Sequence, residues 1–301
     1  MGISQYIKEI GRGKDGARSL TREQAADLMG QVLDGTVSDL AIGGFCLAMR
    51  IKGETAEEMA GFLDATQARL TRVPASRRPV VVLPSYNGAR KLPVLTPLLA
   101  LLLAREGLPV LVHGTATETK RVVAAEVLEA LGVPAQAAVP AMEPGAVAFV
   151  PTEVLCPGLK RLLDVRREVG LRNSAHSLVK LMNPCAGASL IVGSYTHPEY
   201  AVSMAATFEL IGANALLLRG TEGEPVADPR RTPQMEAFRH GQRVLVQEAQ
   251  GGSLAVLPDL PKAIDATSTA AYIQAVMAGR LPVPAPIARQ VERILHEVSA
   301  S

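Results

Sequence analysis

The chain has 301 residues, of which 48% are hydrophobic and 20% charged, and its formal net charge is +2 at pH 7. This balance is typical of a globular protein of one or two domains, which excludes a disordered chain. The longest apolar stretch, residues 92–104, is shorter than a bilayer requires, and the first residues show no apolar signal region, so we expect a cytoplasmic protein without a membrane partner.

The first seventy residues carry the start and stop signals of several helices. Two pairs have capping-box spacing, Thr21 with Gln24 and Thr55 with Glu58. Gly35 and Gly53 supply the stops. Between these signals residues 38–51 are apolar nearly all round, so we expect that helix to be buried on several sides.

Two helices joined near residues 34–37 leave two interpretations open. One is a DNA-reading helix-turn-helix, whose second helix must offer polar and basic side chains to a groove. The other is an αα-hairpin that is buried or forms a dimer. The second helix carries apolar side chains at Ala41, Ile42, Phe45 and Leu47. The sequence therefore favours the αα-hairpin.

From residue 80 onward, short β-rich apolar runs alternate with helix-like segments. The runs lie at residues 80–83, 108–112, 146–150, 189–193, 215–218 and 243–246, and helical patterns include residues 93–105 and 120–131. This alternation predicts an α/β domain with a mostly parallel sheet. Three prolines at residues 282–286 suggest a stiff bend before a last helix at 287–298.

A basic, helix-like segment at residues 157–181 interrupts the strands. We expect this segment to rejoin the N-terminal helices. The predicted organisation is a small all-helical domain at 1–76, rejoined by 157–185, and a larger α/β domain at 77–156 and 186–301. The three cysteines, Cys46, Cys156 and Cys185, have no metal-ligand spacing, so we expect reduced, mostly buried thiols.

The loop at residues 84–91 follows the first apolar run and carries Arg90 and Lys91. In a strand–loop–helix unit the first N–H groups of the helix are unpaired, and together with the helix dipole and nearby cations they attract anions. The loop is therefore either a phosphate site or an ordinary βα turn with solvated basic residues.

Basic residues are clustered in two parts of the chain. Residues 67–91 hold six cations and no carboxylate, and residues 156–180 hold six cations against two carboxylates. Such clustering is the electrostatic footprint of a polyanion partner, although a run of charge is also typical of a solvated face.

Residues 41–58 resemble the N-terminal helical signature of the anthranilate phosphoribosyltransferase superfamily (glycosyltransferase family 3). Later segments follow in that family's order: the strand and loop at 80–91, residues 112–114, 127–132 and 170–172, and Asn183-Pro184. The resemblance covers nearly the whole chain. It implies a small helical domain, a nucleoside-phosphorylase- and phosphoribosyltransferase-like α/β domain, and a homodimer through the N-terminal helices.

Within that superfamily, four segments resemble the YbiB-type, DNA-binding group: residues 84–91, 171–178, 197–200 and 220–224. The catalytic members hold phosphoribosyl pyrophosphate on a Gly-Thr-Gly-Gly-Asp loop, because glycines let the backbone approach the diphosphate. In this chain the aligned loop has Pro84, which lacks an N–H, the bulky Tyr86, and Gly88 at the acidic position.

The charged groups of the catalytic members are also replaced. Their diphosphate-binding lysine is Val112 here, and their magnesium-binding Asp–Glu pair falls near Pro225 and Val226, although Glu222 and Glu224 lie close by. A site without the lysine and the acidic pair loses most of its electrostatic catalysis. We therefore assign no catalytic residue, no metal and no cofactor, and whether the chain is an enzyme stays open, with the balance against it.

The resulting hypothesis is a nucleic-acid-binding protein, for DNA or RNA, with little sequence specificity. Arginines and lysines can follow a phosphate backbone without reading bases. The candidate contacts are Ser85, Tyr86, Asn87, Gly88, Arg90, Lys91, Lys120, Arg121, Arg166 and Arg172, with Lys120 and Arg121 expected to open a helix. Aromatic residues are scarce, so only Tyr86 and Tyr200 are candidates for stacking on bases.

Two other classes of function remain open. One is a magnesium-dependent phosphoribosyltransferase, or a related glycosyltransferase, with an unidentified acceptor. The other is an interaction protein that docks a partner through the apolar helix at residues 38–51, which dimerisation explains more simply.

Overall fold

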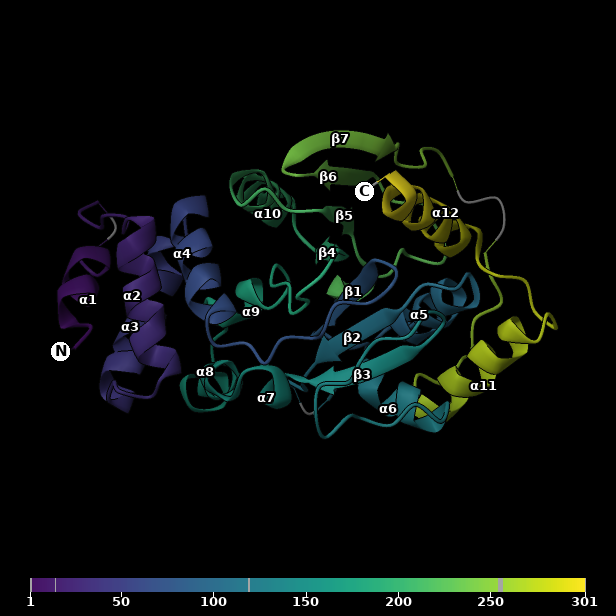
Figure 1. The fold of residues 1–301 in the computed structure, drawn as a ribbon, viewed down its shortest axis with the longest axis horizontal. Helices are drawn as coiled ribbons and strands as arrows, with labels where there is room; N and C mark the ends of the chain where they lie inside the picture. The colour runs from purple at the N-terminus through teal and green to yellow at the C-terminus, as the bar shows by residue number, and fades with distance from the viewer. Residues whose placement is uncertain (1, 14, 119, 254–256, 301) are drawn as a thin grey trace. The chain divides into compact units, whose positions relative to one another are not determined.

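The computed structural model describes residues 2–13, 15–118, 120–253 and 257–300. The chain forms two compact units (Figure 1), one of Met1–Thr71 with Thr152–Pro184 and one of Arg72–Pro151 with Cys185–Ser301. Each unit has its own core. Within the described residues, no helix combines the length and the hydropathy that crossing a bilayer requires.

The first unit is entirely helical, as predicted for the small domain. Its helices are α1 (Ser4–Ile10), α2 (Arg22–Leu33), α3 (Asp39–Lys52), α4 (Ala56–Gln67), α7 (Thr152–Leu155), α8 (Pro157–Val169) and α9 (Ala175–Leu178). Both predicted capping boxes are confirmed, at the starts of α2 and α4. A Cβ on Gly61 would lie 2.2 Å from the carbonyl oxygen of Arg22, so glycine is required where α4 packs closely against α2.

Helix α3 departs from the expected burial on several sides. It buries Phe45 and Met49 completely, but Leu40, Leu47 and Ile51 are exposed at 88%, 42% and 75%. Positions 40, 47 and 51 are spaced by seven and four residues, so they lie on one face of the helix. The chain by itself therefore leaves one apolar face of α3 uncovered.

The second unit is built on a seven-stranded sheet in the order β3-β2-β1-β4-β5-β6-β7. The strands are β1 (Val80–Ser85), β2 (Val110–Gly114), β3 (Val147–Pro151), β4 (Ser189–Tyr195), β5 (Ala215–Arg219), β6 (Met235–Arg239) and β7 (Gln242–Gln247). The first five strands in sequence are parallel, and β6 and β7 add an antiparallel edge. The predicted α/β class and mostly parallel sheet are confirmed.

One strand and one helix start were not predicted correctly. Strand β6 contains Glu236 and Ala237, which have low β-propensity, so its sequence gives a weak strand signal. The helix expected from residue 120 is α6 (Ala124–Ala130). Lys120 and Arg121 precede it, because the backbone of Val122 pairs with Ala89 through hydrogen bonds of 2.8 and 3.1 Å.

Helices cover both faces of the sheet. Helix α5 (Thr96–Arg105) packs on one face together with α12 (Ala285–Ala300), which includes the last helix expected from the sequence, while α11 (Ala266–Met277) packs against α5 and α6. Helix α10 (Pro198–Leu210) lies against β4 and β5 on the other face (Figure 1).

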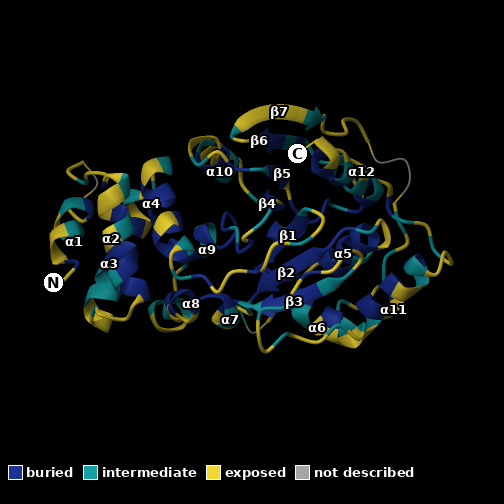
Figure 2. Cartoon of the chain, in the orientation of Figure 1, coloured by how far each residue is buried: buried dark blue, intermediate teal, exposed yellow. Residues whose placement is uncertain are grey.

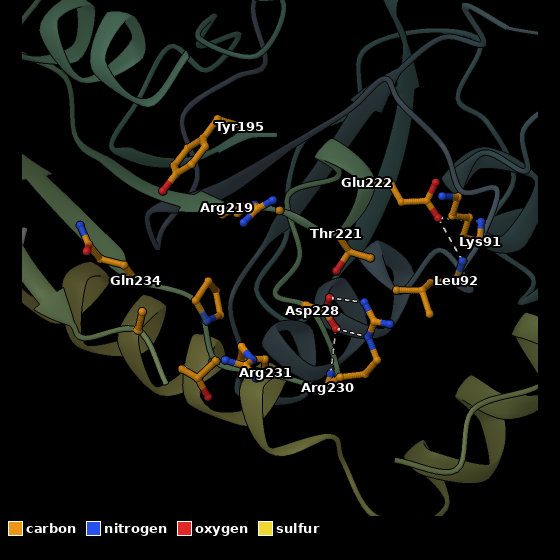
Figure 3. A pocket seen from close by; sticks show the side chains of 14 residues that line it. Lys91, Leu92, Tyr195, Arg219, Thr221, Glu222, Asp228, Arg230, Arg231 and Gln234 are labelled. Atoms are coloured by element: carbon orange, nitrogen blue, oxygen red, sulfur yellow. Dashed lines mark hydrogen bonds and ion pairs between the residues drawn. The ribbon is translucent and has the colours of Figure 1, made fainter. Parts of the chain in front are cut away.

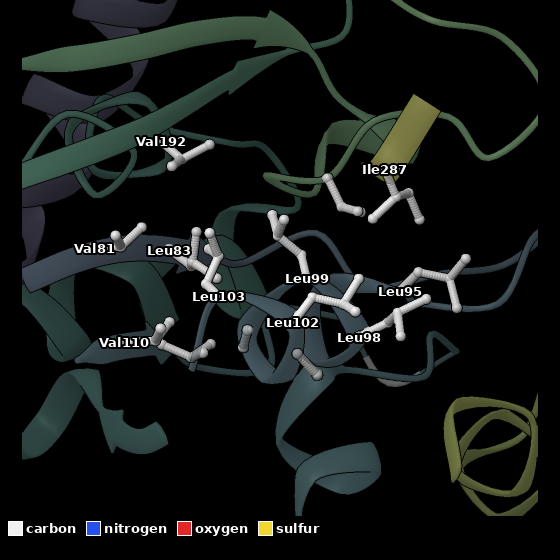
Figure 4. Close-up of a cluster of buried hydrophobic side chains, with 14 of the residues drawn as sticks. Val81, Leu83, Leu95, Leu98, Leu99, Leu102, Leu103, Val110, Val192 and Ile287 are labelled. Carbon is white, nitrogen blue, oxygen red and sulfur yellow. The ribbon is translucent and has the colours of Figure 1, made fainter. Parts of the chain in front are cut away.

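The core of the second unit centres on the leucines of α5. Leu98, Leu99 and Leu103 are fully buried, and Leu99 and Leu103 lie between the strand residue Leu83 and the α12 residue Ile287 (Figure 4). Burying a leucine stabilises a fold by roughly 1.5–3 kcal/mol. Strands β1 and β2 are buried along their whole length (Figure 2), so the ends of the strands are held rigidly.

The topology has a switch point between two internal strands of this sheet. Strand order reverses between β1 and β4, since β2 and β3 lie on one side of β1 and β5 lies beyond β4. In parallel sheets, ligands bind outside the carboxyl ends of the strands at such a switch point. The loop at residues 84–91 leaves β1 at this position.

Candidate functional site

The β1 loop is held by a buried carboxylate from a distant turn. Glu224 is 1% exposed and follows the short 3₁₀ turn η1 (Thr221–Gly223). Its Oε1 accepts hydrogen bonds from the backbone N–H groups of Asn87 and Gly88, both at 2.8 Å. Its Oε2 accepts from the hydroxyls of Ser85 and Thr96, the latter at 2.9 Å. A carboxylate thus occupies the position where the loop would hold an anion.

A second carboxylate accepts hydrogen bonds from the N–H groups at the end of the loop. Oε1 of Glu222 accepts from the N–H groups of Lys91 at 2.7 Å and Leu92 at 3.0 Å (Figure 3), and the N–H of Arg90 lies 3.2 Å from both oxygens. Glu222 adopts a left-handed conformation with φ of 53°, which is strained for a residue with a Cβ. Sequence reasoning noted both glutamates only as neighbours of the missing metal pair.

The loop backbone itself depends on glycine at one position. Gly88 has φ of 64°, and a Cβ there would lie 2.7 Å from the carbonyl oxygen of Val122. Three of the predicted contacts, Ser85, Asn87 and Gly88, are buried. The hydroxyl of Ser85 and the backbone N–H groups of Asn87 and Gly88 already donate to Glu224.

The magnesium ion that the fold family implies does not fit these residues. Both oxygens of Glu224 and of Glu222 face hydrogen-bond donors, and a cation placed there would meet N–H and O–H groups instead of free oxygen ligands. Among the residues that the structure describes, no group of three or more His, Cys, Asp or Glu side chains is placed to hold a metal.

Tyr86 is held in the core instead of facing solvent. Its ring is 3% exposed, and its hydroxyl lies 2.8 Å from Nδ1 of His113. Burial lowers the pKa of His113 to about 3, so this histidine is neutral near pH 7. The structure corrects the interpretation of Tyr86 as a platform for stacking on bases, because a buried ring cannot meet a base without rearrangement.

The four predicted cationic contacts in the α/β unit differ in their surroundings. Arg121 braces the loop: it forms ion pairs with Glu118 at 3.1 Å and Glu222 at 3.7 Å. Arg90, Lys91 and Lys120 are exposed. In the described part of the chain, no side-chain hydrogen bond or ion pair engages Arg90 or Lys91. These two side chains remain available to an external anion.

Arg166 and Arg172, the other two predicted contacts, belong to the helical unit. Arg166 lies in the last turn of α8, where a cation interacts favourably with the helix dipole, and both side chains are half-buried. The structure thus brings the loop residues, Lys120 and Arg121 together in one unit, and places Arg166 and Arg172 in the other.

The predicted thiols are confirmed as free and buried. Burial raises the pKa of Cys46 and of Cys185 to about 12 and also raises the pKa of Cys156. The thiolate form, which is the reactive one, is therefore disfavoured at all three positions.

Comparison with known proteins identifies relatives along most of the chain. Residues 4–69 match the helical bundle domain of a glycosyl transferase family. The uncharacterized protein YbiB of Escherichia coli is 43% identical over 297 residues, which cover 94% of this chain and 90% of YbiB. An uncharacterized protein of Aquifex aeolicus is 30% identical over 232 residues, covering 75% of this chain and 71% of the relative.

Solved structures of anthranilate phosphoribosyltransferases share the fold. The enzyme from Thermus thermophilus has a TM-score of 0.72 at 24% identity, covering 95% of this chain and 85% of that one. The Saccharomyces cerevisiae enzyme, in complex with PRPP and Mg, also has a TM-score of 0.72, at 14% identity, covering 99% of this chain and 89% of that one. At these identities the likeness shows the fold alone.

Proposed function

Because this chain belongs to the YbiB-type group of the anthranilate phosphoribosyltransferase-like superfamily, glycosyltransferase family 3, we propose that it binds nucleic acid and does not transfer phosphoribosyl groups. The observation that carries this proposal is the occupation of the β1 loop by Glu222 and Glu224. A diphosphate would have to displace both carboxylates, whereas a phosphate backbone needs only the exposed side chains of Arg90 and Lys91.

The proposed contacts are electrostatic and independent of sequence. Arginine can bind two phosphate oxygens with its planar fork, and lysine adds a point charge. Lys120 lies in the same unit as Arg90 and Lys91, and Arg166 and Arg172 are proposed as contacts from the helical unit. DNA and RNA carry the same phosphate chemistry, so both are proposed ligands. We place this activity in the cytoplasm, where the three buried thiols would stay reduced.

Binding to unrelated DNA and RNA oligonucleotides across a salt series tests the proposal. We expect saturable binding at low salt that differs little between sequences. The logarithm of affinity should fall with the logarithm of salt concentration at a slope of about −0.7 to −0.9 per neutralised phosphate. Absence of binding at low salt, or saturable binding of phosphoribosyl pyrophosphate that requires magnesium in calorimetry, would contradict the proposal.

We also propose a homodimer through α3. The exposed face of Leu40, Leu47 and Ile51 is the kind of apolar surface that a second copy would cover. Leu47→Glu combined with Ile51→Glu should convert a dimer to a monomer at micromolar concentration, because both charges would be buried against apolar side chains. Light scattering coupled to size exclusion measures the mass.

The control for the dimer is Val202→Glu, on α10 of the other unit, where the valine is 70% exposed. This variant should keep the mass of the unmodified protein. A monomer before any substitution, or a dimer that tolerates both α3 charges, would refute the proposed interface.

A further inference from the structure

A second candidate site lies beside the loop, at the carboxyl ends of β4 and β5. A cavity of about 530 Å³ opens there, and Figure 3 shows its lining side chains. Its lining includes Lys91 of the loop and Glu222, which accepts from the loop, but residues 85–88 do not line it. Its volume falls in the range of roughly 300–1,000 Å³ that is typical of small-molecule sites.

The cavity carries an excess of positive charge. Four cations line it, Lys91, Arg219, Arg230 and Arg231, against the two carboxylates of Glu222 and Asp228. Both carboxylates are already engaged: Glu222 accepts from the loop, and Asp228 accepts from the guanidinium of Arg230 at 2.8 and 2.9 Å. An anion entering the cavity would therefore meet cations whose charge is only partly balanced.

Arg219 is the cation best placed for a ligand. It ends β5, is exposed, and has no side-chain hydrogen bond or ion pair with any residue that the structure describes. Arg231, in contrast, is fixed by the carbonyl oxygens of Gln250 and Gly252, at 3.4 and 2.9 Å. Arg219 therefore has no fixed hydrogen-bond partner among the described residues, although its charge attracts Asp228, whereas Arg231 is held in place.

A tyrosine occupies the strand position paired with Arg219. Tyr195 ends β4, and in the register of the two parallel strands it pairs directly with Arg219. Burial, with the nearby charge of Glu236, raises the pKa of Tyr195, so its hydroxyl stays protonated and can donate. Both side chains line the cavity from paired strand positions, and a guanidinium together with a hydroxyl is suited to the oxygens of a phosphate.

The rest of the lining suits a ligand larger than phosphate. Leu92, Pro233 and Ala249 give apolar wall, and Thr232 and Gln234 give polar groups. We propose that this cavity binds a small phosphate monoester of nucleotide size, with its phosphate held by Arg219 and Tyr195. The monoester could be a free mononucleotide or the phosphorylated end of a strand. This proposal does not depend on the binding of a nucleic-acid backbone by Arg90 and Lys91.

Calorimetry of the full chain with adenosine 5′-monophosphate tests the site. We expect saturable binding, and at least tenfold weaker binding of adenosine, because the phosphate supplies the charge-assisted hydrogen bonds. Arg219→Ala should lower the affinity for the monophosphate at least tenfold. Arg280→Ala, an exposed arginine outside the cavity, should leave it unchanged.

A second variant and a competition measurement complete the test. Tyr195→Phe keeps the ring and removes the hydroxyl, so it should weaken monophosphate binding several-fold even if Arg219→Ala fails to fold. Competition by a 5′-phosphorylated dinucleotide, but not by its unphosphorylated form, would assign the site to a strand end, and competition by neither would assign it to a free nucleotide. No binding of the monophosphate, equal binding of adenosine, or full affinity in both variants would overturn the proposal.

Discussion

Reversing both exposed charges of the β1 loop, Arg90→Glu with Lys91→Glu, is expected to lower affinity for a single-stranded oligonucleotide about a hundredfold at 0.1 M salt. Affinity falls because two phosphate contacts are lost and because the two new carboxylates repel the phosphates. For a single-stranded probe, the slope of log affinity against log salt should become shallower by about 1.4, which is about 0.7 for each of the two lost contacts. Fluorescence anisotropy of a labelled oligonucleotide, measured over a salt series, provides both quantities.

A matched variant tests whether affinity depends on the charges of the loop or only on the net charge of the protein. Lys262→Glu with Arg280→Glu changes the formal charge by the same amount at two exposed positions that are not proposed contacts. It should lower affinity only slightly, through the long-range field. If the two double variants lost affinity equally, binding would follow net charge alone, and the loop would have no special role.

Local patterns predicted most of the fold. Alternating apolar runs marked six of the seven strands, and capping-box spacing at Thr21 and Thr55 marked two helix starts. The start of α6 was misplaced because a bridge between Ala89 and Val122, 33 residues apart in the chain, holds the preceding backbone extended. Such pairing between distant segments leaves no periodic signal in either one.

The sequence predicted where the candidate site lies, at the loop after β1, but not that two glutamates accept the hydrogen bonds of that loop. The strand–loop–helix pattern predicted unpaired N–H donors in the first turn of the helix after β1. In the structure the donors that face the carboxylates belong instead to loop residues 87–92, which precede α5. What satisfies those donors lies far along the chain: Glu224 is 137 residues from Asn87 and Glu222 is 131 residues from Lys91. Only the adjacency of β1, β4 and β5 brings the turn after β5 to the loop after β1. The two glutamate carboxylates accept from the N–H groups of the loop, so the exposed side chains of Arg90 and Lys91 remain available to an external anion.

Removing the buried carboxylate of Glu224 is expected to have the largest effect on stability. Glu224→Ala should lower the free energy of unfolding by about 3–5 kcal/mol, because it leaves the N–H groups of Asn87 and Gly88 and the hydroxyls of Ser85 and Thr96 without their buried acceptor. Urea unfolding followed by circular dichroism measures the change.

Glu222→Ala is the informative comparison, since the side chain of Glu222 is 16% exposed and water can replace it at the N–H groups of Lys91 and Leu92. Its loss should cost about 1–2 kcal/mol. Alanine has a Cβ and relieves no strain at φ of 53°, whereas glycine relieves it. Glu222→Gly should therefore be more stable than Glu222→Ala. Equal losses for Glu224→Ala and Glu222→Ala, or a loss below about 1 kcal/mol for Glu224→Ala, would show that the buried carboxylate does not hold the loop.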